Sequence, residues 1–184
     1  MAQLEIIGQR LILRLITESD LEAIHQLQSI PEVDRYNTLG IPKDFEETKT
    51  VMAPLLEATQ KENIDYYTFA IEQKSSKNLV GLIALILGPK KYNSGEVWFK
   101  LNPSFWGNGF ATEALNSILE FGFNTLKLHR IEAGCAVDNL ASSNVLEKAG
   151  MQPEGRRRKT LPLKTGWSDN FEYAILENDK RSAV

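Results

Sequence analysis

The chain has 184 residues, 42% of them hydrophobic and 24% charged, and its formal net charge at pH 7 is −3. This length and composition indicate one soluble globular domain over residues 1–184, with its core at about 8–178. The balanced charge gives no general electrostatic field that would attract nucleic acid. No apolar run reaches the ~18 residues of a membrane span. We therefore expect a cytoplasmic protein that binds neither nucleic acid nor a membrane.

The first third of the chain predicts one strand and two helices. Residues 10–16 alternate loosely between apolar and polar and predict a strand, and Thr17 is a suitable cap for a helix over 18 to about 28. Residues 30–44 contain two prolines and a glycine and predict a loop. A second helix is expected from about 45 to 61.

The middle of the chain predicts three strands, at 66–72, 79–87 and 96–101. Turn-rich segments at 73–78 and 88–95 join them, so the three should pair as an antiparallel meander. The second strand is apolar throughout and should therefore be central.

The rest of the chain alternates helices with strands. Apolar residues recur at helical spacing from 111 to 126, which predicts a helix whose amino end lies near Gly109. Residues 131–137 alternate as a strand does. Asn139 is a suitable cap for a helix over 140–149.

Two further strands, at about 151–158 and 170–176, close the chain. The order is then strand, two helices, three strands, helix, strand, helix and two strands. It predicts an α/β (α+β) fold with a mixed, mostly antiparallel seven-stranded sheet and about four helices on both faces.

Two glycines stand before the helix that starts near residue 110, in the segment Phe-Trp-Gly-Asn-Gly-Phe-Ala-Thr-Glu-Ala-Leu. Glycine allows a positive φ and a close approach of the backbone to a ligand, and the first amides of a helix point outward without partners. Together they suit phosphate oxygens. The alternative is a tight turn that only caps the helix.

Metal chemistry and cysteine chemistry both find little support. His25 and His129 lie inside or at the end of predicted helices, and no cluster of Cys and His has metal-ligand spacing, so we expect no metal. Cys135, the single cysteine, could act as a nucleophile, but its place on the apolar face of a strand favours a buried, inert thiol.

The chain resembles the GCN5-related N-acetyltransferases (GNAT), most closely their RimJ/RimL branch, through four blocks in the same order. The resemblance covers nearly the whole chain. It implies one N-acetyltransferase domain with a GNAT-like fold, which transfers the acetyl group of acetyl-CoA directly to a primary amine such as the N-terminus of a ribosomal protein. The blocks are 10–14 with Asp20, 101–115, 139–151, and 154–155 with Trp167, Asp169 and Tyr173.

The resemblance also implies where acetyl-CoA, the co-substrate, binds. Residues 106–112 hold its pyrophosphate by backbone amides, and 98–101 pair with the pantetheine arm where two strands splay apart. Two asparagines near the later helix hold adjacent cofactor atoms, although Asn139 also fits a simple helix cap. The cofactor residues are Trp98, Phe99, Lys100, Leu101, Trp106, Gly107, Asn108, Gly109, Phe110, Ala111, Thr112, Asn139 and Asn144.

Direct acetyl transfer needs a base for the amine and an acid for the leaving thiolate. By resemblance the base is Glu96. The alternative for Glu96 is a solvated glutamate at the end of a strand with no catalytic role. Asp169 and Glu172 are the other candidates for the base. Ser142 matches the serine proposed to protonate the thiolate in the ribosomal-protein branch, and it could also cap its helix. Leu161 stands where some members have a glutamate, which weakens the match to their mechanism.

The acceptor amine is not determined by the sequence. Residues 30–44 and 161–169 should line its site by resemblance, and their acids could meet a cationic amine. A protein N-terminus, a polyamine or another small amine remain open, and so does a homodimer. A non-catalytic acetyl-CoA sensor or scaffold is the alternative function. The acids are Glu32, Asp34, Asp44 and Asp169.

Overall fold

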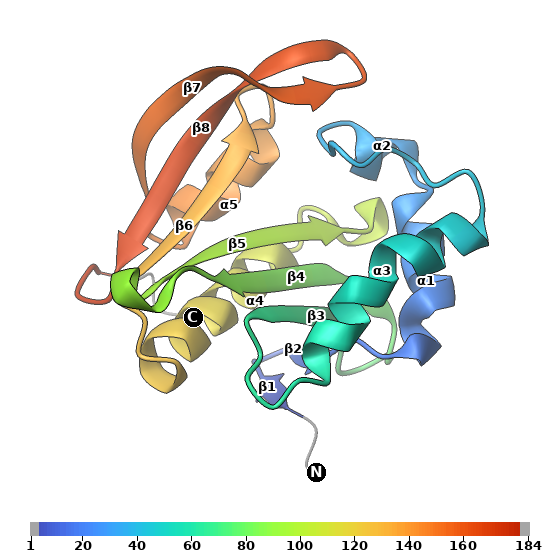
Figure 1. The fold of residues 1–184 in the computed structure, drawn as a ribbon, viewed down its shortest axis with the longest axis horizontal. Helices are drawn as coiled ribbons and strands as arrows, with labels where there is room; N and C mark the ends of the chain where they lie inside the picture. Colours follow the sequence, from blue (N-terminus) through green and yellow to red (C-terminus); the bar gives the residue numbers. More distant parts are fainter. Residues whose placement is uncertain (1–3, 181–184) are drawn as a thin grey trace.

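The computed structural model describes residues 4–180 and shows a sheet covered by helices on both faces (Figure 1). Within these residues the sheet has eight strands in the order β1-β2-β3-β4-β5-β6-β8-β7. All neighbouring strands pair antiparallel except β5 and β6, which are parallel. The strands are β1 (Glu5–Ile7), β2 (Leu11–Leu15), β3 (Tyr66–Gln73), β4 (Leu79–Leu87), β5 (Ser94–Leu101), β6 (Arg130–Ala136), β7 (Gln152–Leu163) and β8 (Gly166–Leu176).

The predicted mixed, mostly antiparallel sheet is confirmed, with one strand more than the seven expected. The additional strand, β1, has only three residues and pairs with β2. Three residues are too few to show an alternating pattern, so β1 could not be predicted from its residues.

The helices differ from the prediction mainly at their ends. A short helix occupies 31–34, where a loop was expected, because proline is favoured in the first turn of a helix. The predicted helix to about 126 ends as an α-helix at Glu120 and continues as one π-helical turn. The α-helices are α1 (Leu21–Gln28), α2 (Pro31–Asp34), α3 (Phe45–Thr59), α4 (Phe110–Glu120) and α5 (Leu140–Lys148).

Two hydrophobic cores hold these layers together. The larger one lies between the sheet and the α4 and α5 side, where Leu115 and Ile118 are completely buried. The smaller one packs Ile24 of α1 and Met52 of α3 on the opposite face. Within residues 4–180, no helix is long and apolar enough to cross a membrane.

Strands β7 and β8 form a long hairpin that projects beyond the rest of the sheet toward α2 (Figure 1). The strand predicted at about 151–158 extends to Leu163, and the segment 161–169, for which no strand was predicted, forms the tip of this hairpin. A proline in this segment, Pro162, is compatible with a strand because β7 is the edge of the sheet. At the hairpin tip, Lys164 forms an ion pair with Asp34 of α2.

Candidate functional site

Strands β5 and β6 separate in the middle of the sheet (Figure 1). They pair only from Ser94 to Glu96 of β5, opposite Arg130 to Glu132 of β6. Beyond that point, Val97 to Leu101 of β5 have no strand partner on this side within the described residues. Unpaired backbone N–H and C=O groups at such an edge are free to bind an extended ligand.

The glycine-rich loop at the start of α4 lies just after this free edge. Gly107 and Gly109 have φ values of 75° and 77°, in the left-handed region that favours glycine. A side chain on Gly107 would meet nothing within 4 Å, so the loop faces open space. The amides before Glu113, whose N–H reaches the carbonyl of Gly109 at 3.0 Å, begin the helix without internal acceptors.

Side chains of the loop hold its shape. The Asn108 amide donates to the carbonyl of Trp106 at 3.0 Å, and the Trp106 indole donates to the carbonyl of Leu101 at 2.9 Å. The second contact ties the loop to the end of β5. Arg10, for which sequence reasoning assigned no contact, donates from Nη1 to the carbonyl of Asn108 at 3.0 Å.

Asn139, Ser142 and Asn144 all lie at the start of α5. Asn139 caps the helix, because its Oδ1 accepts from the Ser142 N–H at 3.2 Å. The Ser142 hydroxyl is not needed for this cap, and Asn144 is exposed. Their roles toward a cofactor stay predictions. Cys135 lies behind them, buried against Ser143, and burial raises the pKa of its thiol, which disfavours a nucleophilic role.

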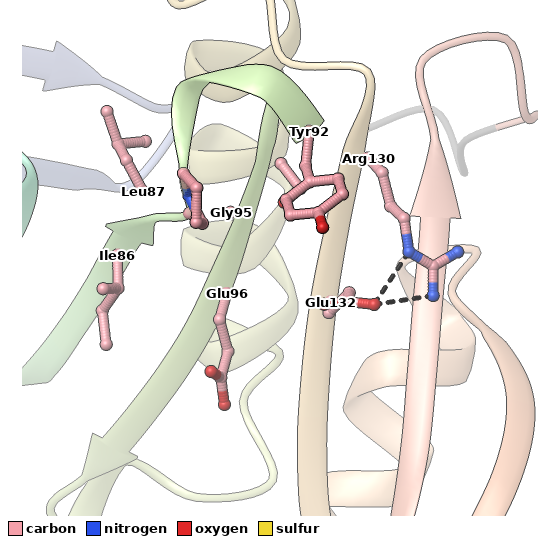
Figure 2. A pocket seen from close by; sticks show the side chains of 10 residues that line it. Ile86, Leu87, Tyr92, Gly95, Glu96, Arg130 and Glu132 are labelled. Atoms are coloured by element: carbon pink, nitrogen blue, oxygen red, sulfur yellow. Dashed lines mark hydrogen bonds and ion pairs between the residues drawn. The ribbon is translucent and has the colours of Figure 1, made fainter.

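Glu96 lies at the point where β5 and β6 separate and lines a hollow of about 480 Å³ on the face opposite α4. Figure 2 shows it beside Tyr92 and Glu132, with Glu132 held by Arg130. Glu132 was not predicted as a site residue. The only signal for it is its position on the polar face of a strand that adjoins Glu96.

The environment of Glu96 favours its neutral form. Burial raises the pKa of this carboxyl, and the negative charges of Glu132 and Glu172 raise it further, against a smaller opposing effect of Arg157. Both neighbours are paired, since Glu132 contacts Arg130 at 2.8 Å and Glu172 contacts Arg157 at 3.3 Å. In the part of the chain that the structure describes, Glu96 has no ion pair or hydrogen-bonded side chain. Of Glu96, Glu132 and Glu172, Glu96 is therefore the carboxylate that is free to accept a proton.

The alternative base Asp169 is occupied. It accepts from the backbone N–H of Lys159 at 2.9 Å and pairs with Arg156 at 2.7 Å, and these contacts lower the pKa of its carboxyl. Glu172 accepts from Asn170 at 2.6 Å in addition to its ion pair. Neither is as free to accept a proton as Glu96.

Most of the acids expected to meet the acceptor also have internal partners. Asp34 is 4% exposed and paired with Lys164, and Asp44 caps α3 by accepting from the Glu47 N–H at 2.9 Å. Glu32 is exposed. Lys100 lies near Asp34, and burial lowers the pKa of its ammonium group while Asp34 opposes that change.

Comparisons with known proteins agree on one family. Residues 10–152 match the family model described as "Acetyltransferase (GNAT) domain". The uncharacterized N-acetyltransferase YoaA of Bacillus subtilis (strain 168) is 35% identical over 168 residues, 91% of this chain and 94% of that protein.

Solved structures give the same result. An acetyltransferase of the GNAT family from Bacillus anthracis superposes with a TM-score of 0.82 at 32% identity, covering 95% of this chain and 99% of that one. Spermidine N-acetyltransferase from Vibrio cholerae, in complex with CoA and spermine, superposes with a TM-score of 0.80 at 26% identity, covering 91% and 96%.

Proposed function

Because the chain belongs to the GNAT family of acetyltransferases and uses acetyl-CoA, we propose that it transfers the acetyl group directly to a primary amine, with Glu96 as base and Ser142 as acid. One observation supports this most strongly: an unpaired carboxylate with a raised pKa lies where the free edge of β5 begins. A base and a site for an extended cofactor therefore adjoin each other.

The residues present fit acetyl-CoA, which supplies the thioester when bound. The free edge from Val97 to Leu101, apart from the Leu101 carbonyl that already accepts from the Trp106 indole, would pair with the amide groups of the pantetheine arm. The amides around Gly107 and Gly109 would hold the pyrophosphate at the start of α4, where the helix dipole favours negative charge.

Glu96 would make the acceptor nucleophilic. An amine in water is mostly protonated at neutral pH, since its reference pKa is ~10.4 for a lysine-like amine and ~8 for a protein N-terminus. Glu96 would accept that proton, directly or through water, and its raised pKa makes it a stronger base than an ordinary glutamate. Ser142 would then donate a proton to the departing sulfur.

The acceptor class that we favour is a small cationic amine of the polyamine type. The hollow is lined by two carboxylates, Glu96 and Glu132, and by one cation, Arg130. Its lining therefore carries a net negative charge when Glu96 is ionised, which would attract a cation. A relative of 26% identity is named a spermidine N-acetyltransferase and was crystallised with spermine. A protein N-terminus, as in the RimJ/RimL branch, is the second candidate. It rests on the sequence blocks and on a relative of 28% identity over 55% of this chain, the putative ribosomal N-acetyltransferase YdaF of Bacillus subtilis (strain 168).

An acetylation assay with a panel of amines tests this function. The protein should release CoA thiol from acetyl-CoA when spermidine or spermine is added, and less when short peptides with ribosomal-protein N-termini are added. Peptide turnover without polyamine turnover would move the acceptor to the second candidate. Binding of acetyl-CoA without thiol release across the panel would support a non-catalytic sensor or scaffold instead.

Replacing Ser142 with alanine should lower kcat with little change in the KM for acetyl-CoA, because protonation of the thiolate belongs to the transition state. The helix cap would survive, since it uses the Ser142 N–H and not the hydroxyl. Acid catalysis typically contributes ~10²-fold or more. Steady-state kinetics measure the loss in kcat for Ser142→Ala. Ser142→Thr, which keeps the hydroxyl, is measured beside it as the control. A loss well below tenfold would exclude Ser142 as the catalytic acid and leave its hydroxyl at most a positioning role.

A further inference from the structure

Arg10 and Glu113 join two parts of the chain that are 103 residues apart. The Glu113 carboxylate accepts from the backbone N–H of Arg10 at 2.6 Å, from Nε of Arg10 at 2.8 Å, and from the backbone N–H of Leu11 at 3.1 Å. The Glu113 side chain is only 4% exposed. Glu113 thus fixes both the start of β2 and the guanidinium of Arg10 against the first turn of α4.

The other side of the guanidinium faces the glycine-rich loop. Its Nη1 donates to the Asn108 carbonyl at 3.0 Å, and its central carbon lies 4.5 Å from the centre of the Phe110 ring. Its Nη2 lies 3.5 Å from where a side chain on Gly109 would begin. Within the described residues Nη2 has no hydrogen-bond partner, and the Arg10 side chain is 46% exposed. A charged donor is therefore held at the rim of the loop.

Such a donor would complement the charges of this region if a pyrophosphate binds there. No lysine or arginine occurs between Leu101 and Thr112, and the first charged residue of α4 is the acidic Glu113. A buried glutamate one turn from a phosphate would repel it unless a cation is paired with the glutamate. Arg10 supplies that cation, and arginine is well suited to phosphate oxygens.

We propose that Arg10 positions the glycine-rich loop and binds the pyrophosphate of acetyl-CoA through its free Nη2. This rests on the proposed function, because it assumes that the loop holds that pyrophosphate. Glu113 is then a positioning residue that acts through Arg10: it aligns the guanidinium through Nε and leaves Nη2 directed at the ligand. The alternative is an ion pair that only ties β2 to α4.

The test compares Arg10→Gln with Arg14→Gln, using ligands with and without the pyrophosphate. Arg14 is a matched control because, like Arg10, it is an arginine that forms ion pairs with partly or fully buried carboxylates. It lies on β2 and pairs with Asp20 at 2.7 Å and with Glu72 at 3.2 Å, and neither of these residues belongs to the glycine-rich loop. Binding of CoA is measured by calorimetry, and kcat/KM is measured with acetyl-CoA and with S-acetyl-pantetheine, which lacks the pyrophosphate.

Arg10→Gln should weaken CoA binding by about 10- to 100-fold, the range expected for losing a charge-assisted hydrogen bond. Its kcat/KM with S-acetyl-pantetheine should stay near that of the wild type. Arg14→Gln should melt at a lower temperature but bind CoA normally. Where Arg10→Gln fails to fold, Arg10→Gln/Glu113→Gln removes the buried charge as well and should show the same selective loss.

Two results would overturn the proposal: wild-type affinity of the folded variant for CoA, or an equal loss with acetyl-CoA and S-acetyl-pantetheine. The first result would exclude a contact between Arg10 and the pyrophosphate. The second would show that Arg10 forms only a structural ion pair. Failure of the wild-type protein itself to bind CoA would instead contradict the proposed function, so the two failures are distinct.

Discussion

Replacing Gly109 with aspartate should weaken CoA binding by about 100-fold or more while the protein stays folded. Gly109 is the residue before α4 and has a φ of 77°. Aspartate tolerates the left-handed region better than most residues, so the strain on the fold should be about 1 kcal/mol. Its carboxylate, however, would lie where the pyrophosphate is expected. It would also lie within reach of the Arg10 guanidinium and would compete for it.

Gly109→Asn is the matched control, because asparagine has nearly the same shape and the same tolerance of positive φ without the charge. Calorimetry with CoA and thermal melting of both variants separate the electrostatic effect from backbone strain. We expect aspartate to lose much more affinity than asparagine at similar melting temperatures. A normal KM for acetyl-CoA in Gly109→Asp would exclude this placement of the phosphates, and equal loss of fold and binding would favour a loop that only caps the helix.

The sequence predicted those elements whose pattern repeats over several turns or residues. The apolar run of β4 and the helical spacing in α4 were sufficient, because each repeats its period many times. The short β1 and α2 were missed since they depend on tertiary contacts rather than on a repeated pattern. The end of β7 was missed because its register shifts between Arg157 and Leu161.

The site shows the same limit at the level of single side chains. Glu96 could be selected by resemblance, but its electrostatic neighbours could not be, because Glu132 and Glu172 approach it only through the order β5, β6, β8 in the sheet. The contact between Arg10 and Glu113 likewise depends on how β2 lies against the first turn of α4. Spacing along the chain holds no information about such pairs.

Replacing Glu96 with glutamine should lower the rate of acetyl transfer by about 100-fold at neutral pH. Glutamine keeps the size of the side chain and its hydrogen bonding but cannot accept the proton of the amine. The deficit should shrink as the pH rises, because more of the amine is then already neutral. The measurement is kcat and kcat/KM against pH, with the best amine from the acetylation panel.

Glu132→Gln is the matched control for this variant, since it removes the neighbouring carboxylate and leaves Glu96 in place. Glu132 raises the pKa of Glu96, so its removal should lower that pKa and move the acid limb of the pH–rate profile to lower pH. At saturating amine, kcat near neutral pH should change little, whereas the KM for a cationic amine should rise because one negative charge of the hollow is lost. A flat, wild-type-like profile in Glu96→Gln would transfer the base role to Glu172, Asp169 or a backbone-held water, and the acetyltransferase assignment would survive.

The stability of Glu96→Gln shows whether its lost rate comes from lost chemistry or from damage to the fold. The folded-state pKa of Glu96 is raised above the unfolded value of about 4.3, so folding favours the protonated carboxyl. Its destabilising effect is absent below that unfolded value, grows as pH rises, and is complete above the folded-state pKa. Glu96→Gln should therefore melt at a higher temperature than the wild type at neutral pH, and the difference should vanish near pH 4. A slow variant that is more stable at neutral pH fits a catalytic base, whereas a slow variant that is less stable there would attribute the lost rate to the fold.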